Sequence, residues 1–365
     1  MNVPTYRAYQ RDLVEVLRRR NFIYVELQFA KALETYARGA SSDIELSYLV
    51  RAFQTGDVSM APFITEWLTQ RPDSYAANMA AAAHFYELAF QVRGNKMGSD
   101  TSADQQRSFA QFLFESRKYV SRALLLTGKP ITAYEYAIRV AGAIDSRDAV
   151  MALYRQALAF DPQTLSVRDA YIWAMDRRWK GRPDDLANYA VETKAAVLDD
   201  NSKRYVLYLI EMRLGGTAWT YKDKEGAAQH YRAASDLCLQ PEPWLQLANL
   251  YDEFSDWPAA IQSLDTYLLL EPDQAWAIRR KAWAYRSQGA WESAIPLYRQ
   301  AAEMGDDNAQ TTLGWILMTG DHAPLDLDAA IHWLRLATQN NNGDARRYLD
   351  EALQKRYAAT ARTGS

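Results

Sequence analysis

WLQLANLYDEFSDWPAAIQSL at residues 244–264 is followed by IRRKAWAYRSQGAWESAIPLY at residues 278–298. A shift of 34 residues superposes alanine on alanine, tyrosine on tyrosine and tryptophan on tryptophan. The matched pairs are Ala248 and Ala282, Tyr251 and Tyr285, Trp257 and Trp291, and Ala260 and Ala294. A unit of this length holds two helices that cannot bury their own apolar face, so neighbouring units must stack. The sequence therefore predicts an all-α fold, a right-handed α-solenoid of antiparallel helix pairs.

The repeat resembles the tetratricopeptide repeat. Trp244, Leu247-Ala248 and Tyr251 are followed by an alanine, an aromatic residue and then Pro272, as in that repeat. Lys281 is a departure, because it falls where the repeat normally buries an apolar residue. The resemblance implies tetratricopeptide-like repeats over residues 201–308.

A longer period follows at the C-terminal end. Ala309 and Leu313 recur as Ala345 and Leu349, 36 residues later, which resembles the Sel-one-like repeat with its longer inter-helix loop. We expect that loop at residues 319–326. Residues 309–357 are predicted to form this repeat and a capping helix that ends near Tyr357, and residues 358–365 to form a flexible tail.

A more degenerate helix pair precedes these repeats. We expect one helix over residues 203–214 and its partner over residues 224–238, with a break at Gly215-Gly216 because glycine disfavours helix interiors.

Residues 1–200 are predicted to be a diverged helical N-terminal domain. Ser74 can cap an alanine-rich helix that ends at Arg93-Gly94, and a polar loop is expected over residues 94–106. Over about residues 10–200 the chain resembles an uncharacterised proteobacterial domain family that has no established activity. The residues that carry this resemblance are Trp67-Leu68, Pro72, Ser74, Ala77, Arg93-Gly94, Arg178-Trp179-Lys180-Gly181 and Tyr189-Ala190.

Composition and charge exclude several classes of protein. The 365 residues carry 42 basic and 45 acidic side chains, a net charge of −3, which lacks the basic excess of a nucleic-acid binder. Cys238 is the one cysteine, and none of the four histidines forms a His-x-x-x-His pair, so we expect no disulfide, metal site or cofactor. No apolar leader or membrane-length segment is evident, so we expect a cytoplasmic protein that does not bind membranes.

The pattern predicts protein–protein interaction without catalysis. Scattered carboxylates with 11 Trp and 23 Tyr would also suit a helical-toroid enzyme acting on glycans, but no acid–base constellation is evident. Sel-one-like and related solenoids act as immunity proteins in some bacteria. The resemblance therefore implies a bacterial immunity protein that sequesters a secreted antibacterial toxin, with a scaffold or adaptor for an endogenous complex as the alternative. The oligomeric state is left open.

The candidate partner-binding surface lies on the first helices of two successive repeats. The cationic and aromatic strip comprises Trp276, Arg279, Arg280, Trp283 and Arg286. The strip beside it comprises Asn249, Asp252 and Glu253, preceded by Glu242 and Gln246. Trp and Arg are favoured anchors at protein interfaces. The alternative is that the two tryptophans pack between repeats or under the N-terminal domain. If substitutions in the strip leave binding unchanged, we expect the binding surface in the N-terminal domain around Trp67, Arg93 and Trp179.

Overall fold

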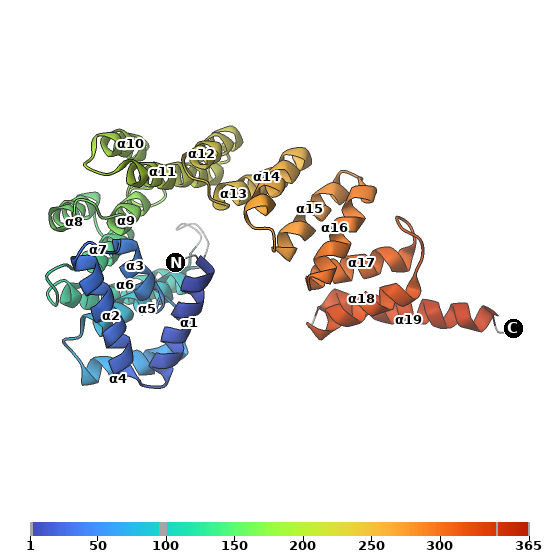
Figure 1. Ribbon diagram of the computed structural model, residues 1–365, viewed down its shortest axis with the longest axis horizontal. Coiled ribbons are helices and arrows are strands. Elements are labelled where there is room, and N and C mark those ends of the chain that lie inside the picture. The colour runs from blue at the N-terminus through green and yellow to red at the C-terminus, as the bar shows by residue number, and fades with distance from the viewer. Residues whose placement is uncertain (1–2, 95–100, 341, 364–365) are drawn as a thin grey trace. The chain divides into compact units, whose positions relative to one another are not determined.

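The computed structural model describes residues 3–94, 101–340 and 342–363, and within these ranges the chain forms helices and no strand (Figure 1). The chain divides into two compact units, Met1–Thr217 and Ala218–Ser365. Every helix of the second unit packs against the helix that follows it, and so do most helices of the first unit. The predicted all-α solenoid of helix pairs is therefore confirmed.

The first unit is built from the helices α1 to α11. Their bounds are α1 Val3–Arg18, α2 Phe22–Ala37, α3 Asp43–Arg51, the 3-10 turn η1 Val58–Met60, α4 Ala61–Gln70, α5 Tyr75–Arg93, α6 Ala103–Ala123, α7 Ile131–Ile144, α8 Arg147–Phe160, α9 Ser166–Ala174, α10 Asp185–Ala195 and α11 Asp200–Thr220. The last of these helices continues past the boundary between the units.

The centre of this unit is α5. Thirteen of its 19 residues are buried, so the helix is covered on nearly every side. The side chain of Ser74 accepts a hydrogen bond from the backbone of Ala77 at its start, and Gly94, at φ 69°, ends it. Both ends are where the sequence predicts them. The alanine run lets α6 pack closely against α5.

Two predictions about helix ends in this unit are wrong. The polar loop expected over residues 94–106 is too long at its C-terminal end, because α6 begins at Ala103 with a capping box between Ser102 and Gln105. Residues 95–100 of that loop lie outside the described part of the chain. The break expected at Gly215-Gly216 is absent, because α11 runs through both glycines. A glycine costs a helix only about 1 kcal/mol relative to alanine, and burial of Gly215 in the packed helix offsets that cost.

The second unit contains α12 to α19. Their bounds are α12 Lys224–Leu237, α13 Glu242–Glu253, α14 Trp257–Leu270, α15 Ala275–Ser287, α16 Trp291–Glu303, α17 Asp307–Thr319, α18 Leu327–Gln339 and α19 Gly343–Thr363. The alanines of the repeat lie where helices cross and are fully buried: Ala248, Ala260, Ala282 and Ala294.

The longer loop of the last repeat lies at residues 320–326, close to its predicted place. Lys281, the departure from the repeat, forms an ion pair with Asp265 and lies over the ring of Tyr285, which accommodates its charge. The final helix α19 continues to Thr363 instead of ending near Tyr357.

Candidate functional site

The arginines of the predicted surface are held by neighbouring repeats. On α15, Arg280 Nη1 donates a hydrogen bond to Asn249 Oδ1 at 2.6 Å, and its other terminal nitrogen forms an ion pair with Asp252 on α13. Only 20% of the Arg280 side chain and 15% of the Asp252 side chain are exposed. The structure therefore brings the two predicted strips together, but it does so by pairing their charges with each other.

The other two arginines of α15 are occupied in the same way. Arg279 forms an ion pair with Asp306 at 2.9 Å, and Asp306 also caps α17 by accepting a hydrogen bond from the backbone of Ala309. Arg286 lies over the rings of Trp291 and Trp315, at 5.6 and 5.7 Å from their centroids. These arginines hold successive helix pairs together.

The two tryptophans of the strip have different surroundings. The indole of Trp276 packs against Tyr267 and donates a hydrogen bond to Gln274 Oε1, so this side chain is partly buried between helices. Trp283 stands edge-on to Trp257 with ring centroids 4.9 Å apart, and 38% of the residue is exposed. Trp283 thus keeps an exposed indole on a helix whose three arginines are engaged with neighbouring residues.

Glu253 is the exposed acidic member of the surface. Its carboxylate accepts a hydrogen bond from Trp219 Nε1 at 2.5 Å and forms an ion pair with Lys222. The hydrogen bonds from Lys222 and Trp219 hold the pKa of Glu253 below its ordinary value, so this carboxylate is charged at neutral pH.

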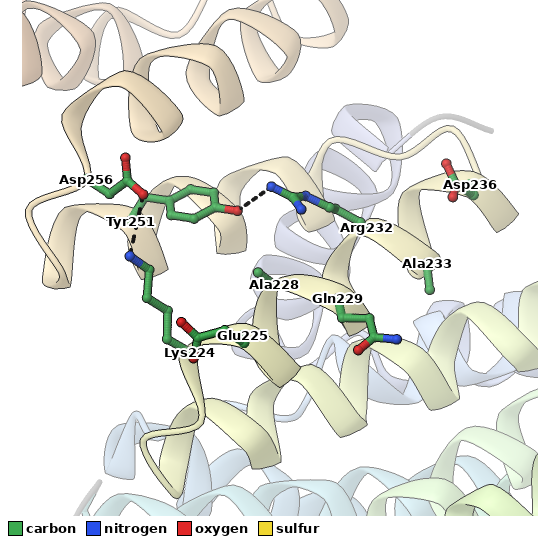
Figure 2. A pocket seen from close by; sticks show the side chains of 9 residues that line it. All are labelled: Lys224, Glu225, Ala228, Gln229, Arg232, Ala233, Asp236, Tyr251 and Asp256. Atoms are coloured by element: carbon green, nitrogen blue, oxygen red, sulfur yellow. Dashed lines mark hydrogen bonds and ion pairs between the residues drawn. The ribbon is translucent and has the colours of Figure 1, made fainter.

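A hollow of about 580 Å³ lies beside this surface, between α12 and the turn that precedes α14 (Figure 2). The ring of Tyr251 forms one wall, with the Lys224 ammonium 5.7 Å from its centroid and Arg232 donating a 2.8 Å hydrogen bond to its hydroxyl. Lys224 also reaches Asp256 at 3.4 Å. Figure 2 shows Glu225, Gln229 and Asp236 along the α12 side of the hollow. The sequence did not single out this hollow, although the spacing of Lys224, Ala228 and Arg232 places them on one helix face.

The first unit contains a buried polar cluster between α3, α7 and α9. Glu135 is fully buried and pairs with Arg51 at 3.1 Å and with Arg139 at 3.3 Å, and Arg139 also reaches Asp169 at 2.6 Å. Burial alone would raise the pKa of the Asp169 carboxyl, but Arg139 and Arg51 outweigh it and hold that pKa below its ordinary value. The cluster ties three helices together and is charge-matched.

The Arg178-Trp179-Lys180-Gly181 element follows α9 and forms a tight turn. The buried Asp176 carboxylate accepts hydrogen bonds from the backbone and side chain of Arg178 and from Thr217 Oγ1. A Cβ atom at Gly181 would lie 1.7 Å from the carbonyl oxygen of Met175, so only glycine fits there. Three residues of the first unit were named as the alternative binding surface. Trp67 is fully buried, whereas the Arg93 guanidinium lies 5.0 Å from the centroid of the Trp179 ring.

Within the described ranges, no group of three or more His, Cys, Asp or Glu side chains is placed to hold a metal ion. No helix in that part of the chain is long and apolar enough to cross a membrane.

No family model matches the chain, and no curated protein matches it. Similar solved structures include a chain from the APC/C hetero-tetramer Cut9-Hcn1, with TM-score 0.36 and 14% identity over 86% of this chain. This chain spans 64% of the length of that chain, less than two thirds. A Sel1 repeat protein from Oxalobacter formigenes gives TM-score 0.35 and 15% identity over 90% of this chain and 93% of that chain. The protective antigen c5321 of uropathogenic Escherichia coli strains, which displays an SLR fold, gives TM-score 0.33 and 15% identity over 93% of this chain and 82% of that chain.

Proposed function

We propose that this chain is a non-catalytic protein-interaction solenoid that binds a protein partner through the surface around Trp283. The exposed indole of Trp283 carries this proposal. Large aromatic side chains that a rigid scaffold already holds in place lose little entropy on binding and act as anchors at interfaces. Trp257 holds the Trp283 ring from one side, and the charged pair of Arg280 and Asp252 fixes the neighbouring surface.

The charge of this surface favours a protein over a nucleic acid. Arg279 and Arg280 already pair with acids of the chain, and Glu253 is an exposed carboxylate. Such a surface offers a polyphosphate few free cations, and phosphate neutralisation supplies most of the affinity of nucleic-acid binders. A partner surface that combines an apolar pocket with mixed charge would fit it.

The finer proposal is that the chain is a bacterial immunity protein that sequesters a secreted toxin in the cytoplasm. Its support is the resemblance of residues 309–357 to the Sel-one-like repeat, because solenoids of that kind serve this role in some bacteria. A scaffold for an endogenous complex would use the same surface, and the identity of the partner separates the two functions.

The test begins with the full chain as bait in an extract of its native cell, followed by identification of the proteins that co-elute. We expect Trp283→Ala to weaken binding of the captured partner by about 2 kcal/mol, or about 30-fold in Kd. The matched control is Leu269→Ala, which truncates a residue that is 82% exposed on α14. Melting temperatures of both variants establish that they are folded.

Two outcomes decide the proposals. A folded Trp283→Ala variant that binds the partner as tightly as the native chain contradicts the proposed surface. If the partner is a toxin, co-expression of the native chain should restore growth of cells that produce it, whereas a partner that is harmless to those cells identifies a scaffold.

A further inference from the structure

Arg93 and three aromatic rings form one continuous surface of the first unit. The Arg93 guanidinium lies 5.0 Å from the centroid of the Trp179 ring, and Trp179 lies 4.5 Å from Trp173. Phe90 joins them, edge-on to both tryptophans at 5.6 and 5.9 Å. Among the described residues, Arg93 stacks on aromatic rings and has no carboxylate partner.

Arg213 on α11 is the second guanidinium of this region, and its one ion pair in the described chain is long. Its nearest carboxylate within the described chain is Asp176, at 3.7 Å from Nε, which is too long for a hydrogen bond. Burial, with Arg178 and Arg139 close by, holds the pKa of Arg213 below its ordinary value in spite of Asp176 and Asp169. The site therefore disfavours the charge that Arg213 carries, and an added anion would stabilise it.

The carboxylates around Arg213 form hydrogen bonds or ion pairs with other residues. Asp176 is taken by Arg178 and Thr217, Asp169 is taken by Arg139, and the buried Glu135 lies between Arg51 and Arg139. Tyr86 connects the two regions, because its ring lies 4.8 Å from Phe90 and its hydroxyl lies within electrostatic range of Arg139 and Arg213. The side chain of Arg213 is 27% exposed, so a ligand can reach it.

We propose that the surface formed by Arg93, Trp173, Trp179 and Arg213, here called the arginine–tryptophan face, binds an acidic segment of a protein partner. A carboxylate would pair with Arg213, a second carboxylate with Arg93, and an aromatic or apolar side chain between them would pack on the two indoles. Arginine suits this task because it can stack on an aromatic ring and still hydrogen-bond a carboxylate. The inference rests on the proposed function in that the ligand belongs to a protein.

A protein segment fits this face better than a nucleic acid does. The Arg213 guanidinium lies near the carboxylates of Asp176 and Asp169. These acids would repel the closely spaced phosphates of a nucleic-acid backbone, whereas separate carboxylates on a peptide can avoid them.

The test uses the full chain and a labelled peptide of about twelve residues in which glutamate and tyrosine alternate, with fluorescence anisotropy at low salt as the readout. A lysine–tyrosine peptide of the same length and a labelled oligothymidylate serve as comparison probes. We expect the acidic peptide to bind and the other two probes not to bind. We expect the double change Arg93→Gln with Arg213→Gln to weaken binding at least about tenfold.

The matched control is Arg107→Gln with Arg155→Gln, which removes two exposed arginines of α6 and α8 in the same unit. We expect this control to bind like the native chain. Arg93→Glu alone provides a second variant, because no ion pair of Arg93 within the described chain is broken by it, and it should abolish binding in a chain that melts normally.

No binding of the acidic peptide by the native chain, equal binding by the double variant, or tighter binding of the oligothymidylate would each overturn the proposal. Trp283→Ala should leave peptide binding unchanged. If the peptide fails to bind while Trp283→Ala still weakens capture of the native partner, the inference falls and the proposed function stands.

Discussion

Asp43 holds together two helices that are distant in the sequence, and removing its carboxylate should loosen the first unit. Asp43 is 3% exposed at the start of α3. Its carboxylate accepts hydrogen bonds from Thr164 Oγ1 at 2.6 Å, from the backbone of Leu165 at 2.9 Å and from the backbone of Ser166 at 2.7 Å. It thereby caps α9 from another part of the chain, since α9 has no side-chain cap of its own.

The size of the effect follows from these bonds. Asp43→Ala leaves two backbone N–H groups without an acceptor, at about 2 kcal/mol each, or about 4 kcal/mol together. The Thr164 hydroxyl is left out of this sum because it can rotate to another acceptor. Asp43→Asn keeps one acceptor oxygen and should cost about half as much.

Hydrogen exchange of individual amides is the suitable assay, because two units need not unfold as one. We expect Asp43→Ala to lower the protection of α9 amides by about three powers of ten, and amides of α17 in the other unit to keep theirs. The control is Asp73→Ala, which removes an aspartate whose side chain is 78% exposed. A loss of α9 protection of less than about tenfold, or an equal loss in both units, would show that Asp43 does not act as this cap.

Two further outcomes concern the stability of the first unit. Gly181→Ala should destabilise it by at least about 3 kcal/mol, because the new methyl group meets the carbonyl of Met175, whereas Gly128→Ala, with open space around it, should leave the melting temperature unchanged. The free energy of unfolding should also fall as pH rises from 10 to 12. Burial raises the pKa of three tyrosines from 10.0 to about 12, so only the unfolded chain ionises them in this pH range. Each tyrosine then removes about 2.7 kcal/mol of stability. These tyrosines are Tyr75, Tyr86 and Tyr171. Absorbance at alkaline pH that shows every tyrosine of the folded chain ionising near 10 would contradict this.

The repeats and their helix pairs could be predicted from the sequence because their determinants are local. Ala248 and Ala282 recur at a fixed spacing and mark helix crossings whatever the surrounding sequence. The Ser74 cap and the Gly94 helix end are likewise encoded within one turn of the helix that they bound.

The missing break in α11 and the Asp43 cap, which the sequence did not reveal, have a different cause. Gly215-Gly216 has the local signature of a break, but burial in the first unit and the bond from Thr217 to Asp176 hold α11 continuous. The Asp43 cap joins residues more than 120 positions apart, so no local pattern announces it. Tertiary contacts decide both features, and a single sequence does not display them.

The predicted binding strip was read from residue type and helical spacing, which place side chains on one face but do not say what they contact. Arg280 shows the difference. The spacing puts it beside Trp283, and the structure engages it with Asn249 and Asp252. One oxygen of Asp252, Oδ1, is already buried without a hydrogen-bond partner.

This arrangement determines how a mutational scan of the strip must be interpreted. Arg280→Ala would strand a mostly buried carboxylate, and breaking such a pair costs several kcal/mol whether or not a partner touches it. Binding would weaken because the fold is destabilised, and a mutational scan would wrongly score Arg280 as an interface hot spot. Trp283 and, in the first unit, Arg93 and Arg213 are different, because the fold leaves part of their surface or charge unused. Loss of binding with unchanged melting temperature at these three positions identifies contact with a partner. Loss of binding with a lowered melting temperature at Arg280 identifies only a weakened repeat.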